Sequence, residues 1–262
     1  MKKLLSLMLI AAMVLSLAAC GSGSPAESTG GGGKKYIIAT DTTFAPFEFT
    51  DADGNFVGID VDILAAIAED QGFEYELQSL GFDAAVAALE SGQADGTIAG
   101  MSITEERQKK YDFSQPYYDS YVCIAAKEGS DIKGFEDLKG KKVAAKTGTQ
   151  GADCAEALAE EFGYDKDSDI VYFKESDKMY QDVLTGNTVV CFEDQPVMAY
   201  GISQGNGLKI VGDRQADYST PYGFAVLKGQ NQELLEMFDK GLENIRANGK
   251  YDEIVAKYTE SK

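Results

Sequence analysis

The stretch GTIAGMSITEERQKKYDFS, residues 96–114, decides how the rest of this 262-residue chain is interpreted. It begins with a short apolar run at residues 97–99 and then turns polar up to Arg107. This pattern predicts a strand that ends in a loop at the start of a helix. Open α/β sheets bind small ligands at the carboxyl ends of their strands, and a guanidinium there matches a carboxylate bidentately. Arg107 is therefore a candidate ligand contact, although a surface ion pair with Glu105 or Glu106 also fits the spacing.

The same stretch resembles the AG-x-[ST]-x-T-x-ER…DFS-x-P-Y-[YF] signature of the solute-binding proteins of polar amino-acid ABC importers. Four more segments resemble that family in the same order, namely ATDTTFAPFEF (39–49), VGIDVDI (57–63), KTGT (146–149) and FEDQP (192–196). The resemblance covers nearly the whole chain after residue 35. It implies a two-lobed, periplasmic-binding-protein-like α/β fold, in which two crossing hinge segments join the lobes and the ligand lies in the cleft.

The first 19 residues have the pattern of a signal peptide, with two lysines, an apolar run and small residues before Cys20. The apolar run, residues 4–17, is shorter than the ~20 residues that a membrane-spanning helix needs. LAAC at residues 17–20 resembles a bacterial lipobox, which implies cleavage before Cys20 and lipidation of its sulfur. We therefore expect an extracytoplasmic protein, lipid-anchored to the outer face of the cell membrane or periplasmic.

Residues 20–35 are rich in Gly and Ser, which predicts a flexible linker after the lipidated cysteine. Beyond it, strand-like and helix-like stretches alternate as expected of α/β lobes. We expect one lobe from residues 36–118 and 220–262 and the other from residues 123–213. The hinges should lie near the two junctions between these ranges.

The charge balance excludes several functions. The chain carries 24 basic and 43 acidic residues, which argues against nucleic acid and against electrostatic docking on anionic lipid. It has no histidine, so a Ser-His-Asp triad, a Cys-His pair and a His metal ligand are all excluded.

DADGNFVGIDVD, residues 51–62, superficially resembles a calcium loop, but Phe56 stands where the loop needs glycine. We predict instead a hairpin turn at Asp53 and Gly54, and we expect no metal or cofactor.

Three cysteines remain after lipidation of Cys20, and none of them shows C-x-x-C spacing: Cys123, Cys154 and Cys191. Cys123 and Cys191 lie in apolar strand-like runs, where a buried free thiol is expected. One disulfide stays open for an exported protein, and we assign these residues no chemistry.

A zwitterionic amino acid needs a cation for its carboxylate and an anion for its ammonium, in a site that excludes water. Arg107 meets the first need, and backbone amides near Gly100 and Ser102 and in the 147–151 turn add donors. For the ammonium we predict Asp194, which matches the acidic position of the family. Its alternative role is that of a helix cap.

The remaining pocket residues follow from the resemblance. Phe44 and Phe82 match aromatic positions that, in the family, sandwich the aliphatic part of the ligand. Four residues would surround the side-chain end: Asp41, Lys146, Gln150 and Glu193. Lys146 would repel a cationic ligand, so glutamine is favoured over arginine or lysine. The charge of Glu193 keeps the basic amino acids open, because it would neutralise Lys146.

Three functions from different classes fit the sequence. We favour a monomeric receptor that hands a polar amino acid to the permease subunits of an ABC importer. A receptor that serves a sensor kinase would use the same ligand site. The third is an enzyme similar to cyclohexadienyl dehydratases, which share this fold and would need a general acid or base such as Glu193.

Overall fold

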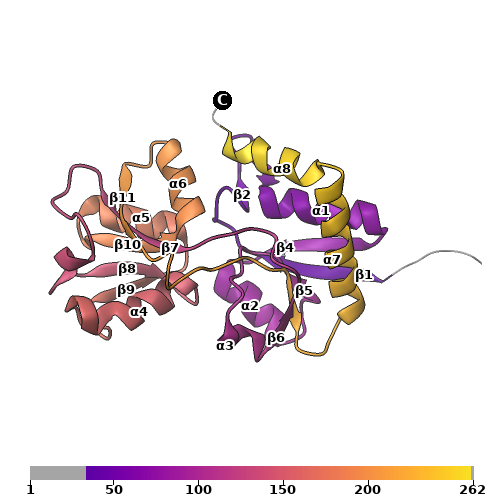
Figure 1. Cartoon of the computed structure of the whole chain (residues 1–262), viewed down its shortest axis with the longest axis horizontal. Helices are drawn as coiled ribbons and strands as arrows, with labels where there is room; N and C mark the ends of the chain where they lie inside the picture. Colours follow the sequence, from indigo (N-terminus) through magenta and orange to yellow (C-terminus); the bar gives the residue numbers. More distant parts are fainter. Residues whose placement is uncertain (1–33, 261–262) are drawn as a thin grey trace, which may run out of the picture. The chain divides into compact units, whose positions relative to one another are not determined.

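The structure is a computed structural model that describes residues 34–260. Residues 1–33 lie outside the described residues, and with them the predicted signal peptide, Cys20 and nearly all of the linker. The described chain forms two α/β lobes, each built on a five-stranded sheet (Figure 1). The two-lobed α/β fold expected from the sequence is confirmed. Within residues 34–260, no helix is both long and apolar enough to span a membrane.

The sheet of the first lobe draws its strands from two distant parts of the chain. Its strands, in spatial order, are β4 (Glu74–Ser79), β1 (Lys35–Thr40), β5 (Gly96–Thr97), β12 (Ala225–Leu227) and β6 (Tyr111–Phe113). β1 pairs in parallel with β4 and β5, whereas β12 is antiparallel to β5 and β6. Because β12 comes after the whole second lobe, the chain must leave this lobe once and return to it once.

Helices cover both faces of this sheet, and the alternation of side chains along β1 shows how. Ile38 packs into one core with α1 (Ile59–Gln71), α7 (Gln232–Ala247) and α8 (Lys250–Thr259). Ile37 and Ala39 point the other way, into a core with α2 (Phe82–Glu90). A strand that is buried on both faces has a continuous run of apolar residues in its sequence, and residues 36–39 form such a run.

A small hairpin precedes α1. Strands β2 (Phe49–Thr50) and β3 (Phe56–Val57) pair in antiparallel fashion, with Phe49 opposite Val57. Gly54 sits in the turn with a φ of 86°, which favours glycine. The hairpin predicted at Asp53 and Gly54 is confirmed.

The second lobe repeats the same architecture. Its strands, in spatial order, are β11 (Leu208–Asp213), β7 (Val122–Lys127), β10 (Val190–Asp194), β8 (Val143–Lys146) and β9 (Ile170–Phe173). The helical segments are η1 (Phe135–Leu138), α4 (Gln150–Phe162), α5 (Ser176–Thr185) and α6 (Gln195–Ser203). Along β7 and β10, Ile124 and Phe192 face the core with α4, and Cys123 and Cys191 face the core with α5 and α6. All three described cysteines are buried free thiols, as expected for Cys123 and Cys191.

Two crossing segments connect the lobes and pair with each other. Isolated bridges join Tyr118 to Tyr222 and Tyr121 to Ser219, and the amide of Thr220 donates to the carbonyl of Ser120 at 2.7 Å. A change of backbone angles in one crossing segment therefore alters the hydrogen bonds of the other.

The strand predicted at residues 97–99 is shorter than expected, because β5 ends at Thr97. The chain turns at Gly100, whose φ is 54°, and it reaches α3 (Glu105–Gln108) after Thr104, whose hydroxyl accepts from the amide of Arg107. This turn carries the predicted ligand loop toward the boundary between the lobes.

Candidate functional site

A small cavity lies at the boundary between the two lobes, at the carboxyl ends of β1, β8 and β10. It is lined by Asp41, Phe44, Phe82, Ala99, Gly100, Ser102, Arg107, Lys146, Thr149, Gln150 and Asp194. Nine of the ten predicted ligand residues are in this set, and Glu193 is the exception. The first seven of the lining residues come from the first lobe and the last four from the second. The site therefore exists only where the two lobes meet.

Arg107 points into this boundary. Its guanidinium donates to the carbonyl oxygens of Ser102 and of Gly148, each at 3.0 Å, and lies 5.5 Å from the centroid of the Phe82 ring. Glu106 pairs with Lys109 instead, so the surface pair that the spacing allowed for Arg107 is not formed. Because Gly148 belongs to the second lobe, the guanidinium already bridges the two lobes.

Gly100 shapes the site through its backbone and lacks a free donor. A Cβ at this position would stand 2.3 Å from the Phe44 ring, so only glycine lets the chain pass so close to that ring. Its amide donates to Oδ2 of Asp60 at 2.8 Å. The Gly100 amide thus already has a partner within the protein, and its contact with the ligand carboxylate stays a prediction.

Asp194 ends β10 at the N-terminus of α6, yet its side chain makes no capping hydrogen bond there. Its Oδ2 accepts instead from the hydroxyl of Tyr222, at 2.6 Å. Burial, and next the nearby charge of Glu193, raises the pKa of Asp194 to about 7. A desolvated carboxylate of this kind is stabilised by a cation, which an ammonium group would provide.

Lys146 and Asp41 form a buried ion pair across the lobes. The side chains are 2% and 1% exposed, and the ammonium also lies 5.3 Å from the centroid of the Phe44 ring. Lys146 ends β8 and Asp41 follows β1, so each stands at the carboxyl end of a strand. These two residues were expected to serve the side-chain end of a ligand, and here they serve each other.

Glu193 does not line the cavity and does not pair with Lys146. Its Oε2 accepts from the hydroxyl of Tyr180 at 2.7 Å, and its Oε1 accepts from the amide of Asp194 at 2.9 Å. Side chains alternate along a strand, so in β10 Glu193 and Asp194 point to opposite faces. Asp41, and not Glu193, is the direct counter-ion of Lys146. Glu193 contributes to the site indirectly, through the hydrogen bond that it accepts from the amide of Asp194.

Residues behind the cavity were not predicted as part of the site. Asp60 is fully buried and accepts from the Tyr117 hydroxyl at 2.7 Å as well as from Gly100. Burial raises its pKa to about 6, and burial raises the pKa of the neighbouring Glu48 well above its usual range. The sequence carried a signal for Asp60, which stands on the apolar face that Ile63 marks on α1.

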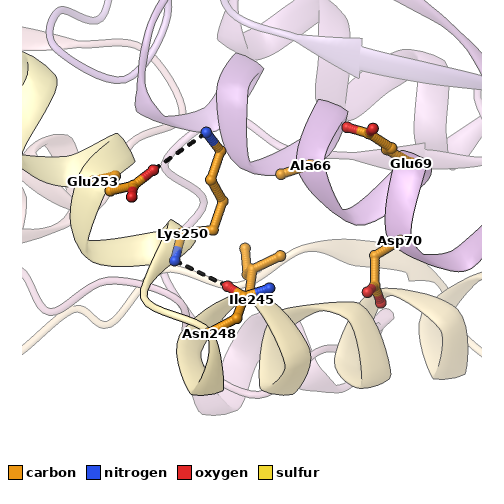
Figure 2. A pocket seen from close by; sticks show the side chains of 7 residues that line it. All are labelled: Ala66, Glu69, Asp70, Ile245, Asn248, Lys250 and Glu253. Carbon is orange, nitrogen blue, oxygen red and sulfur yellow. Dashed lines mark hydrogen bonds and ion pairs between the residues drawn. The ribbon is translucent and has the colours of Figure 1, made fainter.

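A separate surface hollow of about 530 Å³ lies between α1 and the α7–α8 region (Figure 2). It is lined by Ala66, Glu69, Asp70, Ile245, Asn248, Lys250 and Glu253. Lys250 and Glu253 pair there on one helix at 3.5 Å, and none of the predicted site residues is among the lining residues. This hollow has no paired cation and anion from two lobes, so the boundary cavity is the better candidate.

Fold and cavity together define a class: two-lobed α/β proteins that hold a small ligand between their lobes. The chain belongs to the bacterial extracellular solute-binding proteins, family 3, whose pattern matches residues 36–261. Members of this family bind substrates, so the chain is a binding protein, and the interpretation as a dehydratase-like enzyme is set aside.

Several known proteins are similar to this chain. The arginine-binding extracellular protein ArtP of Bacillus subtilis is 31% identical over 98% of both chains. An ancestral arginine-binding protein bound to glutamine is 38% identical, with a TM-score of 0.77 over 87% of this chain and 98% of that one. The second substrate-binding domain of Lactococcus lactis GlnP, in an open conformation, is 45% identical, with a TM-score of 0.57 over 87% of this chain and 96% of that one.

Proposed function

We propose that this protein captures a polar amino acid, with L-glutamine favoured, and delivers it to an ABC importer. One observation carries the proposal: Arg107 from the first lobe and Asp194 from the second line the same cavity. A fixed cation and a desolvated anion on opposite walls match the carboxylate and the ammonium of a zwitterion. The rings of Phe44 and Phe82 line the space between them and would cover the ligand's methylenes.

Lys146 favours a neutral side chain on the ligand. Its ammonium stands in the cavity together with Asp41 and Gln150, so an amide would find both donors and an acceptor there. Because Asp41 balances the charge of Lys146, the pair disfavours a guanidinium or a second ammonium by occupying Asp41, the anion that such a group would need. The relatives leave both ligand classes open, since ArtP is arginine-binding and the ancestral arginine-binding protein is bound to glutamine. Arginine or lysine is therefore the second candidate.

Binding would be coupled to closure of the lobes, because the two halves of the site meet only when the lobes approach. The comparisons support this. The GlnP domain is more similar to this chain in sequence than the ancestral protein is. Its open structure nevertheless superposes less well on this chain than the glutamine-bound structure of the ancestral protein does. Solution scattering tests closure, and an unchanged radius of gyration at saturating glutamine would refute it.

The family and the signal-peptide pattern of the sequence support a cellular setting for this receptor. Lipid on Cys20 would hold the receptor beside the permease subunits, and a monomer suffices because one chain supplies the whole site. A sensor kinase is the alternative partner, because it would bind the same closed form. Cys20→Ser should release the protein from membranes, and retention of that variant on membranes would refute the anchor.

The test of the function is a thermal-shift screen of ligand-stripped protein against the twenty amino acids. We expect glutamine to raise the melting temperature most, because a ligand that binds only the native state stabilises it by mass action. A screen in which no amino acid shifts the transition would overturn the proposal.

A further inference from the structure

A second cavity, of about 360 Å³, lies beside the ligand cavity and is also lined by both lobes. We call it the distal cavity. Among the residues that line it are Thr42, Thr43, Ser176, Tyr180, Tyr200 and Asn206. Its walls mix aromatic rings with hydroxyl and amide groups, and the volume exceeds what a single water molecule needs many times over.

The ion pair of Lys146 and Asp41 contacts residues that line each of the two cavities, and we call this pair the wall. Oδ1 of Asp41 accepts from the amide of Thr42 at 2.6 Å, and Nζ of Lys146 lies 3.5 Å from Oγ of Ser176. Thr42 and Ser176 line the distal cavity, whereas Lys146 and Asp41 line the ligand cavity. The pair therefore touches the ligand cavity on one side and the residues of the distal cavity on the other.

Lys146 is also the cation on which the surrounding acids depend. Asp41 pairs with it directly. Glu193 and Asp194 are buried, which raises the pKa of both, and the charge of Lys146 opposes this rise at each. Removing Lys146 would leave Asp41 without a counter-ion in a buried position, which is strongly unfavourable unless another cation takes its place.

We propose that Lys146 sets both the length and the charge of the ligand, because its ammonium occupies the place that the cationic end of a longer amino acid would take. Without Lys146 the two cavities join, and the guanidinium of arginine reaches Asp41 and the distal cavity. The preference then changes from glutamine to arginine. This inference rests on the proposed function and deepens it.

The experiment is calorimetric titration of the wild type and of Lys146→Ala with glutamine, arginine and citrulline. Citrulline has the length of arginine but a neutral end, so it separates length from charge. In Lys146→Ala we expect arginine to bind at least about ten-fold more tightly than in the wild type, and glutamine at least about ten-fold more weakly. Citrulline should gain less than arginine.

A double variant, Lys146→Ala with Asp41→Asn, keeps the test valid if the single variant folds poorly, because it opens the wall and leaves no unpaired charge. It should accept citrulline in preference to arginine. Lys142→Ala, an exposed lysine just before β8, is the control for loss of one positive charge and should bind as the wild type does.

The outcomes separate the two claims. If the wild type binds no amino acid, the proposed function fails. If the wild type binds glutamine but neither folded variant gains a longer ligand, this inference alone is overturned. A wild type that binds arginine more tightly than glutamine also overturns it, because Lys146 would then exclude nothing.

Discussion

The hydroxyl of Tyr222 donates a 2.6 Å hydrogen bond to Oδ2 of Asp194 and so ties the first lobe to the second. Tyr222 lies where the second crossing segment re-enters the first lobe, and it packs against the rings of Phe47 and Tyr118. Asp194 is the candidate ammonium ligand. The same contact thus orients a ligand group and connects it to the backbone that must bend on closure.

Tyr222→Phe should weaken ligand binding by about 1–2 kcal/mol, because a buried carboxylate loses a charge-assisted hydrogen bond while the aromatic packing remains. Calorimetric titration measures the change. Tyr118→Phe is the matched control, since within residues 34–260 the Tyr118 hydroxyl makes no hydrogen bond. Equal affinities in the two variants would show that the Tyr222 hydroxyl does not position Asp194.

Affinity should fall as the pH is lowered through the pKa of Asp194, which burial raises to about 7. An ammonium needs the ionised carboxylate, so below this pKa each binding event must release a proton, and affinity falls by up to ~10-fold per pH unit. Titration in buffers of different ionisation enthalpy detects that proton. An affinity that stays constant between pH 8 and pH 5.5 would place the ammonium elsewhere.

The stability of the ligand-free protein should depend on pH in the opposite sense to the usual behaviour of carboxylates. A raised pKa means that the folded state keeps a proton that the unfolded state has released, so the contribution of Asp194 decreases as pH rises from about 4 to about 7. Urea unfolding of the wild type and of Asp194→Asn over this range measures it. Parallel curves would contradict the prediction.

Gly100→Ala should destabilise the fold by about 2–3 kcal/mol and abolish ligand binding, because strain at a φ of 54° adds to a clash with Phe44. Gly54→Ala separates the two effects. Gly54 also has a positive φ, 86°, but a Cβ there would have no neighbour within 4 Å, so only strain of about 1 kcal/mol is expected. Equal losses in urea unfolding would mean that the close approach of Phe44 is unimportant.

Arg107→Met should leave the fold intact and cost several kcal/mol of ligand binding, because the buried carboxylate of the ligand would lose its charged partner. Lys109→Met is the control: Lys109 directly follows the same short helix and pairs with Glu106 at the surface, so its loss should change affinity little. Near-normal affinity in Arg107→Met, measured by titration, would show that Arg107 does not bind the ligand and has only a structural role.

Local patterns in the sequence predicted the fold well, because strands such as β1 and β10 are buried on both faces and flanked by turn signals. Asp41, Lys146 and Asp194 were placed in one pocket by the resemblance to the family, and the structure has each of them at or just after the carboxyl end of a strand, in two different sheets. The ion pair between Asp41 and Lys146 could not be predicted. It joins residues 105 positions apart and depends on how the lobes meet.

Two details of the site differ from what the sequence led us to expect, for physical reasons that the sequence only partly contains. Glu193 was placed in the pocket beside Asp194, although alternation along β10 sends adjacent side chains to opposite faces. The Gly100 amide was counted as a free donor because its partner, Asp60, lies 40 residues earlier and is brought beside it only by the tertiary fold.

The most direct test of the whole account is calorimetric titration of the ligand-stripped wild type with L-glutamine. The account predicts one site per chain, filled at micromolar or tighter affinity with a negative heat-capacity change, because both lobes close over the ligand and bury apolar surface. No heat with glutamine, or binding that survives the joint replacement of Arg107 and Asp194, would contradict it.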